Sequence, residues 1–307
     1  MRKEQVIAVI LGSFIGIGVA FGIWRLSRAS EEKNSSSPQT QDNNNQIETK
    51  PTNGKLSIVA PADNAVAVSS SITVSGLTRP NSPVAVSANK IYTKEATGTG
   101  EFSIEVELTP GFNNIVVWSF EKGKVPEKEE LTLIHTDKID DSSAAMQASL
   151  GTVTDIAEDS LQIRTKDGDI VQLSLTDATT YGSIIEEATK EVKFTDLAIG
   201  DFVAALGTQN REGVFEIRRI LITTEPAKAE VTAVVGIVDT LSAKEFIVLP
   251  AEGEEVSVDA TGTVSTFAKG NDGLSSTRLS TAEAGEAIVI IGTFKDKELV
   301  ASTIILL

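Results

Sequence analysis

Residues 194–208 read FTDLAIGDFVAALGT, and residues 279–293 read LSTAEAGEAIVIIGT. In both stretches a glycine and an acidic residue precede an apolar run that ends in Gly-Thr. The glycines fall at 200 and 207 in the first stretch and at 285 and 292 in the second, an offset of 85 residues. A shared phase of glycines and apolar residues over this distance indicates an internal duplication.

The same offset relates residues 151–222 to residues 236–307, called here the first unit and the second unit. Further coinciding residues are Gly151 with Gly236, Gly168 with Gly253, and Ile220-Leu221 with Ile305-Leu306. We expect the two units to share one fold and to be joined by a linker, residues 223–235.

Each unit is predicted to contain five short strands. In the first unit they cover residues 151–156, 160–165, 170–175, 202–208 and 214–222. The triplets Asp167-Gly168-Asp169 and Glu252-Gly253-Glu254 fall at matching hairpin turns, where glycine supplies the positive φ that such turns need. Residues 176–199 can accommodate a short helix. Three strands, a crossover and two strands predict a small OB-like β-barrel, whose closure would remove exposed sheet edges.

The motif in residues 194–208, together with Gly151-x-Val153 at the start of the unit, resembles a bacterial envelope family described only as domain of unknown function 5666. The second unit departs from it, since Glu286 replaces Asp201 and residues 279–284 match more loosely. The family has no assigned activity, so the resemblance implies an architecture and no chemistry. OB-like barrels often bind oligonucleotides or sugars, but nucleic acid requires a basic, aromatic face. These units are acidic and lack tryptophan, so we expect no nucleic-acid partner.

Residues 56–136 consist of short alternating runs separated by Pro, Gly and Asn. Candidate strands cover residues 56–60, 71–75, 83–88, 101–108, 114–120 and 130–134. This spacing predicts a β-sandwich. The patterns are Pro61-x-Asp63-x-x-Val66, Gly100-x-Phe102 and Gly111-x-Asn113-x-Ile115-x-Val117. They resemble the bacterial Ig-like domains of surface proteins and carbohydrate-associated enzymes, over roughly residues 55–135. The resemblance implies an Ig-like β-sandwich that acts as a spacer or a binding module.

One strand of this segment carries the candidate binding surface. Because side chains alternate along a strand, Ile115 and Val117 continue the inward face, and Val116, Trp118 and Phe120 lie on the opposite face. These three residues are a possible binding surface for a ligand or partner. The alternative is burial under a neighbouring domain, or a bulge that turns them inward.

The N-terminal region contains an uncharged run of residues, from Val6 to Trp24. As a helix it would be roughly 28 Å long, close to the hydrocarbon thickness of a bilayer. Basic residues flank the run, and Trp24 occupies the position of an interfacial aromatic. We therefore expect residues 1–27 to be a transmembrane anchor with a short cytoplasmic tip, a cleaved secretory signal being the alternative.

This anchor predicts a single-pass protein of the cell membrane, with the bulk of the chain extracytoplasmic. Two Gly-x3-Gly pairs, at residues 12 and 16 and at 18 and 22, leave open oligomerisation through the anchor. Residues 28–55 are dominated by small polar residues and predict a disordered stalk. Residues 137–150 predict a second linker.

Composition narrows the function further. The net charge of −16 disfavours nucleic acid, whose binding depends on Lys and Arg. The absence of cysteine excludes disulfides and thiolate zinc sites, and the single histidine, His135, cannot form a His-rich metal site. We find no catalytic, cofactor-binding or metal motif, so we expect no enzyme activity and no cofactor.

The leading hypothesis is a non-enzymatic, membrane-anchored envelope protein that acts as a spacer, scaffold or adhesion module. The alternatives are a carbohydrate-binding accessory protein of the cell envelope and a subunit of an export assembly. The expected partners are the membrane and an envelope protein or glycan.

Overall fold

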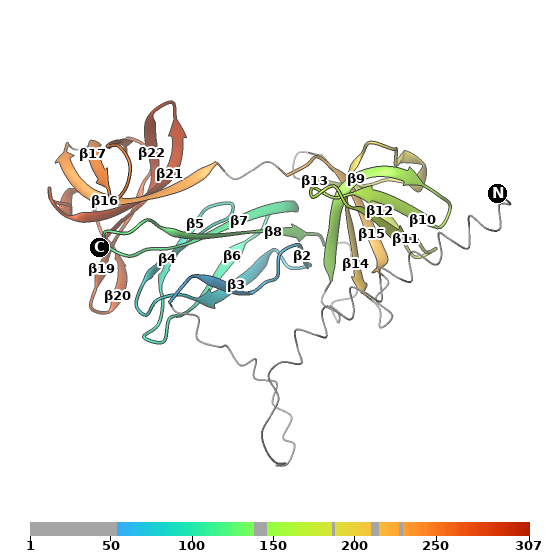
Figure 1. The fold of residues 1–307 in the computed structure, drawn as a ribbon, viewed down its shortest axis with the longest axis horizontal. Coiled ribbons are helices and arrows are strands. Elements are labelled where there is room, and N and C mark those ends of the chain that lie inside the picture. Colours follow the sequence, from blue (N-terminus) through green and yellow to red (C-terminus); the bar gives the residue numbers. More distant parts are fainter. Residues whose placement is uncertain (1–53, 138–145, 186–187, 210–214, 227–229, 243) are drawn as a thin grey trace, which may run out of the picture. The chain divides into compact units, whose positions relative to one another are not determined.

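The computed structural model describes residues 54–137, 146–185, 188–209, 215–226, 230–242 and 244–307. Almost all regular structure in these ranges is β-strand, arranged in three sheets (Figure 1). The predicted anchor from Val6 to Trp24 lies outside the described residues, as does most of the predicted stalk. Within the described part of the chain, no helix has both the length and the apolar character that a membrane crossing requires.

Residues 54–137, called here the proximal segment, contain eight strands. They are β1 (Ser57–Ala60), β2 (Ala65–Ala67), β3 (Ser71–Leu77), β4 (Pro83–Ser87), β5 (Ile91–Glu95), β6 (Glu101–Glu107), β7 (Gly111–Ser119) and β8 (Glu127–His135). Strands β1, β3 and β6 form one sheet, and the other five belong to a second. The predicted alternation is present in β6, where Phe102, Ile104 and Val106 are buried and the residues between them are exposed. These side chains join those of the facing sheet in one apolar core, each contributing roughly 1.5–3 kcal/mol when fully buried.

The first unit contains seven strands and a short 3₁₀ turn. They are β9 (Gln147–Ile156), β10 (Ser160–Arg164), β11 (Ile170–Ser174), β12 (Thr180–Ile185), β13 (Ala188–Glu191), η1 (Phe194–Asp196), β14 (Phe202–Gln209) and β15 (Phe215–Thr223). Residues 176–199, for which a short helix was one possibility, instead contain the paired strands β12 and β13 and the 3₁₀ turn η1. Strand β9 also takes up the end of the predicted linker at residues 137–150.

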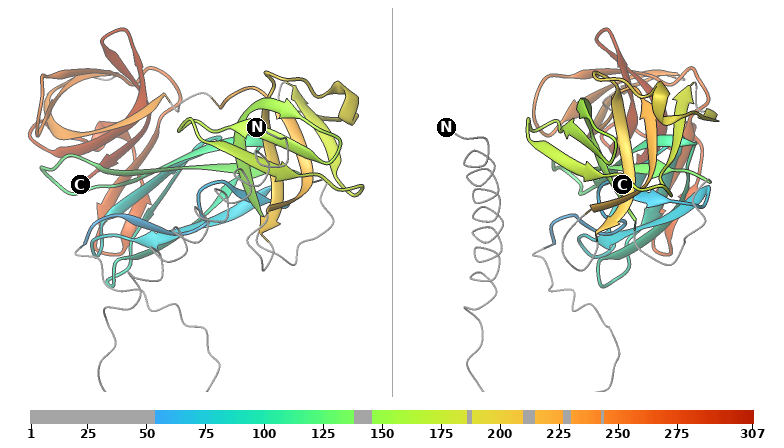
Figure 2. Two further views of the ribbon diagram at one scale, coloured as in Figure 1. Left: turned by 45° about the vertical axis from the view of Figure 1, so that its right-hand side comes forward. Right: turned by 90° about the vertical axis from the view of Figure 1, so that its right-hand side faces the viewer.

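The second unit repeats this order. Its elements are β16 (Val231–Leu241), β17 (Glu245–Pro250), β18 (Val256–Asp259), β19 (Ser265–Gly270), β20 (Gly273–Ser276), η2 (Leu279–Thr281), β21 (Ala287–Lys295) and β22 (Glu298–Leu306). Strand β18 pairs with both β17 and β22, so the strands curl round a common core (Figure 2). The final residues are packed into this core, since Ile304 and Leu306 are buried.

The expected fold class is wrong in the form given above. Among the described residues there is no membrane-spanning helix, and the first unit shares a sheet with the proximal segment instead of closing as a separate barrel, so the predicted fold class and the membrane and signal-anchor assignments find no counterpart there. The described chain is mainly β, and its strands stack along a twelve-stranded sheet that crosses the predicted domain boundary. The crossing is made by β2, which pairs with β8 on one edge and with β9 on the other.

The β2–β9 contact is narrow but uses the backbone. Ala65 lies opposite Gln147, the amide of Ala148 donates to the Asn64 carbonyl at 2.8 Å, and that of Val66 donates to the Met146 carbonyl at 3.2 Å. A strand edge presents unpaired amides and carbonyls that another strand can satisfy, and β9 does so here. The first unit is thus hydrogen-bonded to the proximal segment rather than tethered to it.

The pairing register of the two units agrees at an offset of 85 residues from β9 to β14. Phe202 pairs with Thr152 in the first unit, and Ala287 pairs with Ile237 in the second. The offset then falls to 84 in the last strand, because the final hairpin is shorter. Five residues separate the paired Gln209 and Phe215, whereas four separate Phe294 and Leu299.

This change corrects the predicted coincidence of Ile220-Leu221 with Ile305-Leu306. The structural counterpart of Ile220 is Ile304, and that of Leu221 is Ile305. The shorter loop is a tight turn in which Asp296 takes a positive φ of 55°. Asp and Asn adopt this backbone conformation more readily than most residues with a β-carbon.

Of the two glycines in each opening stretch, the second is explained by close backbone approach, whereas Gly200 and Gly285 take a positive φ. Gly207 and Gly292 both lie at a register shift between the last two strands. A β-carbon would lie 2.1 Å from the Glu216 carbonyl oxygen at Gly207 and 2.0 Å from the Val300 carbonyl oxygen at Gly292. The bulge can therefore form only where the side chain is absent.

Replacement of this glycine should destabilise the protein. In the variant Gly292→Ala the new methyl group must displace backbone, and we expect a loss of about 2–3 kcal/mol in the free energy of unfolding. Denaturant titration of circular dichroism measures this loss. The matched control is Gly262→Ala, because a β-carbon at Gly262 meets no atom within 4 Å. Equal stability of the two variants would contradict the bulge assignment.

Candidate functional site

Each unit carries an apolar patch on the outer side of its last two strands. In the first unit the patch is Ala204, Leu206 and Leu221, and in the second it is Val289, Ile291 and Ile305. These six residues are equivalent by strand register and are fully buried. Since they point away from the core of their own unit, each patch needs a cover from elsewhere in the chain.

The proximal segment covers both patches, at different places. The first patch packs against Ile134 of β8, with Val66 and Phe112 beside it. Phe112 also meets Phe202 of the first unit, with ring centroids 6.4 Å apart and planes tilted by 58°. The second patch packs against Ala85 of β4 and against the end of β7. The two units therefore dock on the proximal segment through the same outer face of their last two strands, at two different places.

The candidate binding surface Val116, Trp118 and Phe120 is part of the second contact. These side chains are 2%, 2% and 1% exposed, and they share an apolar cluster with Val289, Ile291 and Ile305. The surface does lie opposite the core of the proximal segment, as the alternation along β7 predicts. It is covered by the second unit, which is the arrangement described above as burial under a neighbouring domain.

The hairpin after the third strand of each unit makes an additional contact. Ile184 in the β12–β13 hairpin packs against Gly111, where a β-carbon would lie 3.0 Å from its Cδ1. Its counterpart in the second unit is Lys269, which donates to the Asn81 carbonyl at 2.6 Å and lies 3.8 Å from the Glu95 carboxylate. The first contact is apolar and the second is polar, although the backbone positions are equivalent.

A groove lies beside each apolar patch, between the first strand of the unit and the turn of its second hairpin. In the first unit the groove has a volume of about 330 Å³, and its walls within the unit include Ala148, Ser149, Leu150, Thr165, Lys166, Asp167, Asp169 and Val171. In the second unit it has a volume of about 290 Å³, and the walls include Ala233, Val234, Val235, Pro250, Ala251, Glu252, Glu254 and Val256. Every residue of the second list lies 85 positions after its counterpart in the first. The groove is therefore a property of the repeat.

The opposite wall of each groove comes from the proximal segment. Asp63, Asn64 and Thr132 close the first groove, and Val125 and Pro126 close the second. A further cavity of about 420 Å³ adjoins the first groove and shares Asp63, Thr132 and Lys166 with it.

The first groove is acidic with one basic group. Asp167 and Asp169 stand at the turn, and Glu225 approaches from the chain that leaves β15. The carboxylate of Asp63 accepts a hydrogen bond from the Thr132 amide at 2.8 Å. Among the described residues Lys166 forms no ion pair, and no group of acidic or histidine side chains is arranged to hold a metal ion.

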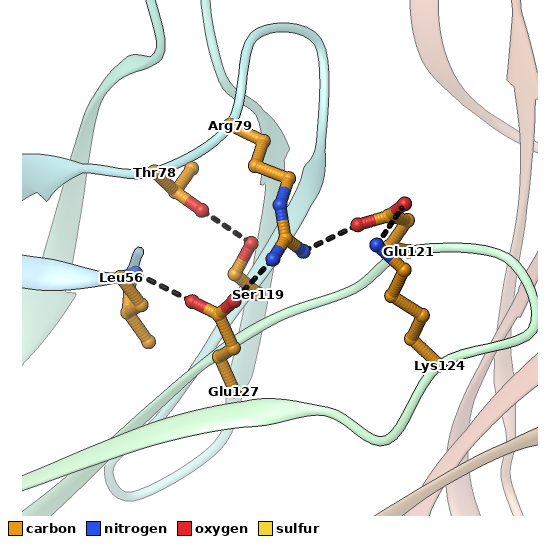
Figure 3. A network of polar contacts seen from close by, with 7 residues as sticks. All are labelled: Leu56, Thr78, Arg79, Ser119, Glu121, Lys124 and Glu127. Carbon is orange, nitrogen blue, oxygen red and sulfur yellow. Dashed lines mark hydrogen bonds and ion pairs between the residues drawn. The ribbon is translucent and has the colours of Figure 1, made fainter. Parts of the chain in front are cut away.

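A polar network holds the β7–β8 hairpin that forms the wall of the second groove (Figure 3). Arg79 lies between the carboxylates of Glu121 and Glu127, which flank the tip of this hairpin, and its distance to Glu127 is 2.7 Å. Glu127 also accepts from the Leu56 amide at 2.6 Å, and the hydroxyls of Thr78 and Ser119 are 2.5 Å apart. The network thereby ties the hairpin to strands β1 and β3 of the facing sheet.

The sequence analysis identified the acidic residues of the grooves, as parts of hairpin turns, but not the residues that face them. The acidic turn triplets were singled out, but turn geometry alone explained them. Nothing in the pattern indicated that Thr132, Glu225 or Val125 would face them, because these contacts join segments far apart in the chain. Arg219 was also missed. Its side chain is 1% exposed and pairs with Glu191 at 2.6 Å.

Comparison with known proteins does not assign this chain to a family. No protein-family model matches the chain, and no curated protein matches it. The resemblances to Ig-like domains and to the envelope family therefore stay predictions.

Truncation of Trp118 should destabilise the protein. Removing this buried indole leaves a cavity between the proximal segment and the second unit, and we expect Trp118→Ala to cost about 3–5 kcal/mol in the free energy of unfolding. Denaturant titration measures the cost. Val59→Ala is the control, because Val59 is 45% exposed and its truncation should change stability little. An unchanged midpoint for Trp118→Ala would contradict the covered arrangement.

The network at the hairpin tip should weaken in acid. The hydrogen bond from Lys124 and the charge of Arg79 lower the pKa of Glu121 below its ordinary value of 4.5. A lowered pKa in the folded state stabilises the fold above the unfolded pKa, and this stabilisation is lost as the pH falls through the folded pKa. Thermal midpoints of the wild type and of Glu121→Gln should therefore differ at pH 7 and converge as the pH falls below 4.5 and through the lowered pKa of Glu121. A constant difference across this range would contradict the ion pair.

Proposed function

We propose that the chain is a non-enzymatic scaffold whose proximal segment holds two copies of one repeat in defined positions. The observation that carries this proposal is the burial of equivalent apolar patches, one from each unit, on two places of the proximal segment. Flexibly tethered domains need no such contacts, because each would satisfy its own core. Because both units bury apolar side chains on the proximal segment, we infer that the role of the chain is to hold the two units at a fixed spacing.

The two units are attached to the proximal segment in different ways. The first unit is joined by backbone hydrogen bonds at β2–β9. Among the described residues the second is joined by its apolar patch and by the Lys269 side chain, and no strand pairing connects it to the proximal segment. A partner that binds both units would then meet surfaces held at one spacing. An extracytoplasmic location stays part of the proposal, because both sequence resemblances are to bacterial surface or envelope proteins.

The glycan-binding alternative loses its main support. It depended on the Ig-like resemblance and on Trp118, since sugar recognition commonly uses an exposed aromatic ring. In this structure the ring is covered by Val289, Ile291 and Ile305. We therefore favour an envelope protein over a glycan as the partner class.

Fixed spacing can be measured directly, because the chain contains no cysteine. Spin labels on the double variants Ala62→Cys with Asp177→Cys, and Ala62→Cys with Lys297→Cys, report the distance from the proximal segment to each unit. All three positions are exposed. Pulsed electron–electron double resonance should give one narrow distance distribution for each pair of labels.

The control introduces a charge into one contact only. Adding Ile291→Asp buries an unpaired carboxylate against Trp118, so the second distribution should broaden while the first stays narrow. Broad distributions for both pairs in the parent protein would contradict the scaffold and favour independent domains.

A further inference from the structure

We propose that the repeated groove is a binding site for an extended polypeptide segment in which basic side chains stand beside apolar ones. The groove occurs twice, at equivalent positions, with volumes of about 330 and 290 Å³. Both values lie near the lower end of the range of roughly 300–1,000 Å³ that is typical of ligand pockets. Recurrence at equivalent positions makes the groove a feature of the repeat and not of one unit.

The walls of the groove define the apolar part of the ligand. Leu150 and Val171 line the first groove. Val256, the counterpart of Val171, lines the second together with the largely buried Val235. The second groove adds Val125 and Pro126 from the hairpin tip, and Val125 is 55% exposed. Small aliphatic side chains, or the methylene stem of a lysine, would cover these surfaces.

The turn of each groove defines the charged part. Asp167 and Asp169 flank Gly168 in the first unit, and Glu252 and Glu254 flank Gly253 in the second. A carboxylate pair on opposite sides of one glycine can accept hydrogen bonds from an ammonium or guanidinium group, and charge-assisted bonds of this kind are about twice as strong as neutral ones. The net charge of −16 would steer a cationic segment toward the chain.

Lys166 distinguishes the two grooves. It lines the first groove beside Asp167, whereas Ala251 takes its place in the second. A lysine at this point repels a basic ligand, so the second groove should bind the segment more tightly. Replacement of Lys166 by alanine should bring the first groove closer to the second.

Other ligand classes serve as outcomes of the test. A divalent cation would use the carboxylates alone and ignore the apolar walls. An oligosaccharide would be insensitive to ionic strength, since it carries no charge to pair with the turn.

The probe is a fluorescein-labelled decapeptide of alternating lysine and valine, titrated with the full chain and followed by fluorescence anisotropy. We expect saturable binding that weakens as salt is raised. The double variants are Asp167→Asn with Asp169→Asn, and Glu252→Gln with Glu254→Gln. Their combination should lower affinity at least tenfold, and Lys166→Ala should raise it.

The matched control is Glu158→Gln with Asp159→Asn, an acidic pair on the same unit that lines neither groove. It removes two charges, as each groove double variant does, and should leave affinity within twofold, whereas each groove double variant alone should lower it. Equal losses in control and groove variants would show that net charge alone attracts the peptide, and would overturn the proposal. Calcium-dependent binding, or equal binding of a decapeptide of alternating glutamate and valine, would overturn it as well.

The experiment separates this proposal from the scaffold role. The substituted carboxylates line the grooves and belong to neither apolar patch, so the spin-label distances should be unchanged in every groove variant. If a groove variant loses peptide binding while its spin-label distances stay unchanged, the loss is due to the groove and not to movement of the units.

Discussion

The structure depends on strands that are apolar on both faces. In each unit the last two strands send one set of side chains into the core of the unit and another set outward. A sheet with one solvated face can stand at the surface of a domain, but one with two apolar faces must be covered on both. The proximal segment supplies the second cover in each case, and the arrangement of the chain follows from this requirement.

The grooves lie next to the docked patches. In both units the recess is found between the first strand and the hairpin turn, and its opposite wall is the proximal segment. What differs between the recesses is the lining. Thr165 and Lys166 of the first unit are replaced by Pro250 and Ala251 in the second.

Local pattern predicted much of the fold. The alternation in β6, the turn glycines and the 85-residue offset all depend on residues close in the chain, and each has a direct structural counterpart. The sequence could not show that β2 would pair with β9, because a three-residue strand carries little periodicity and strand edges have no sequence signature. Nor could it show the change of offset to 84, since Ile304, Ile305 and Leu306 are all apolar and fit either register.

The site was less predictable than the fold. Trp118 could be placed on the outer face of β7, yet its environment depends on residues more than 100 positions later in the chain. The acidic turns were visible, but the surface facing them is built from the proximal segment. Long-range contacts of this kind leave no trace in one sequence.

The unequal attachment of the two units has a consequence for how the chain can open. The first unit shares a sheet with the proximal segment through β2 and β9, whereas the second has a sheet of its own and meets the segment through its apolar patch and the Lys269 side chain. Separation of the second unit would therefore break no strand pairing, and it would bring Trp118 into contact with water.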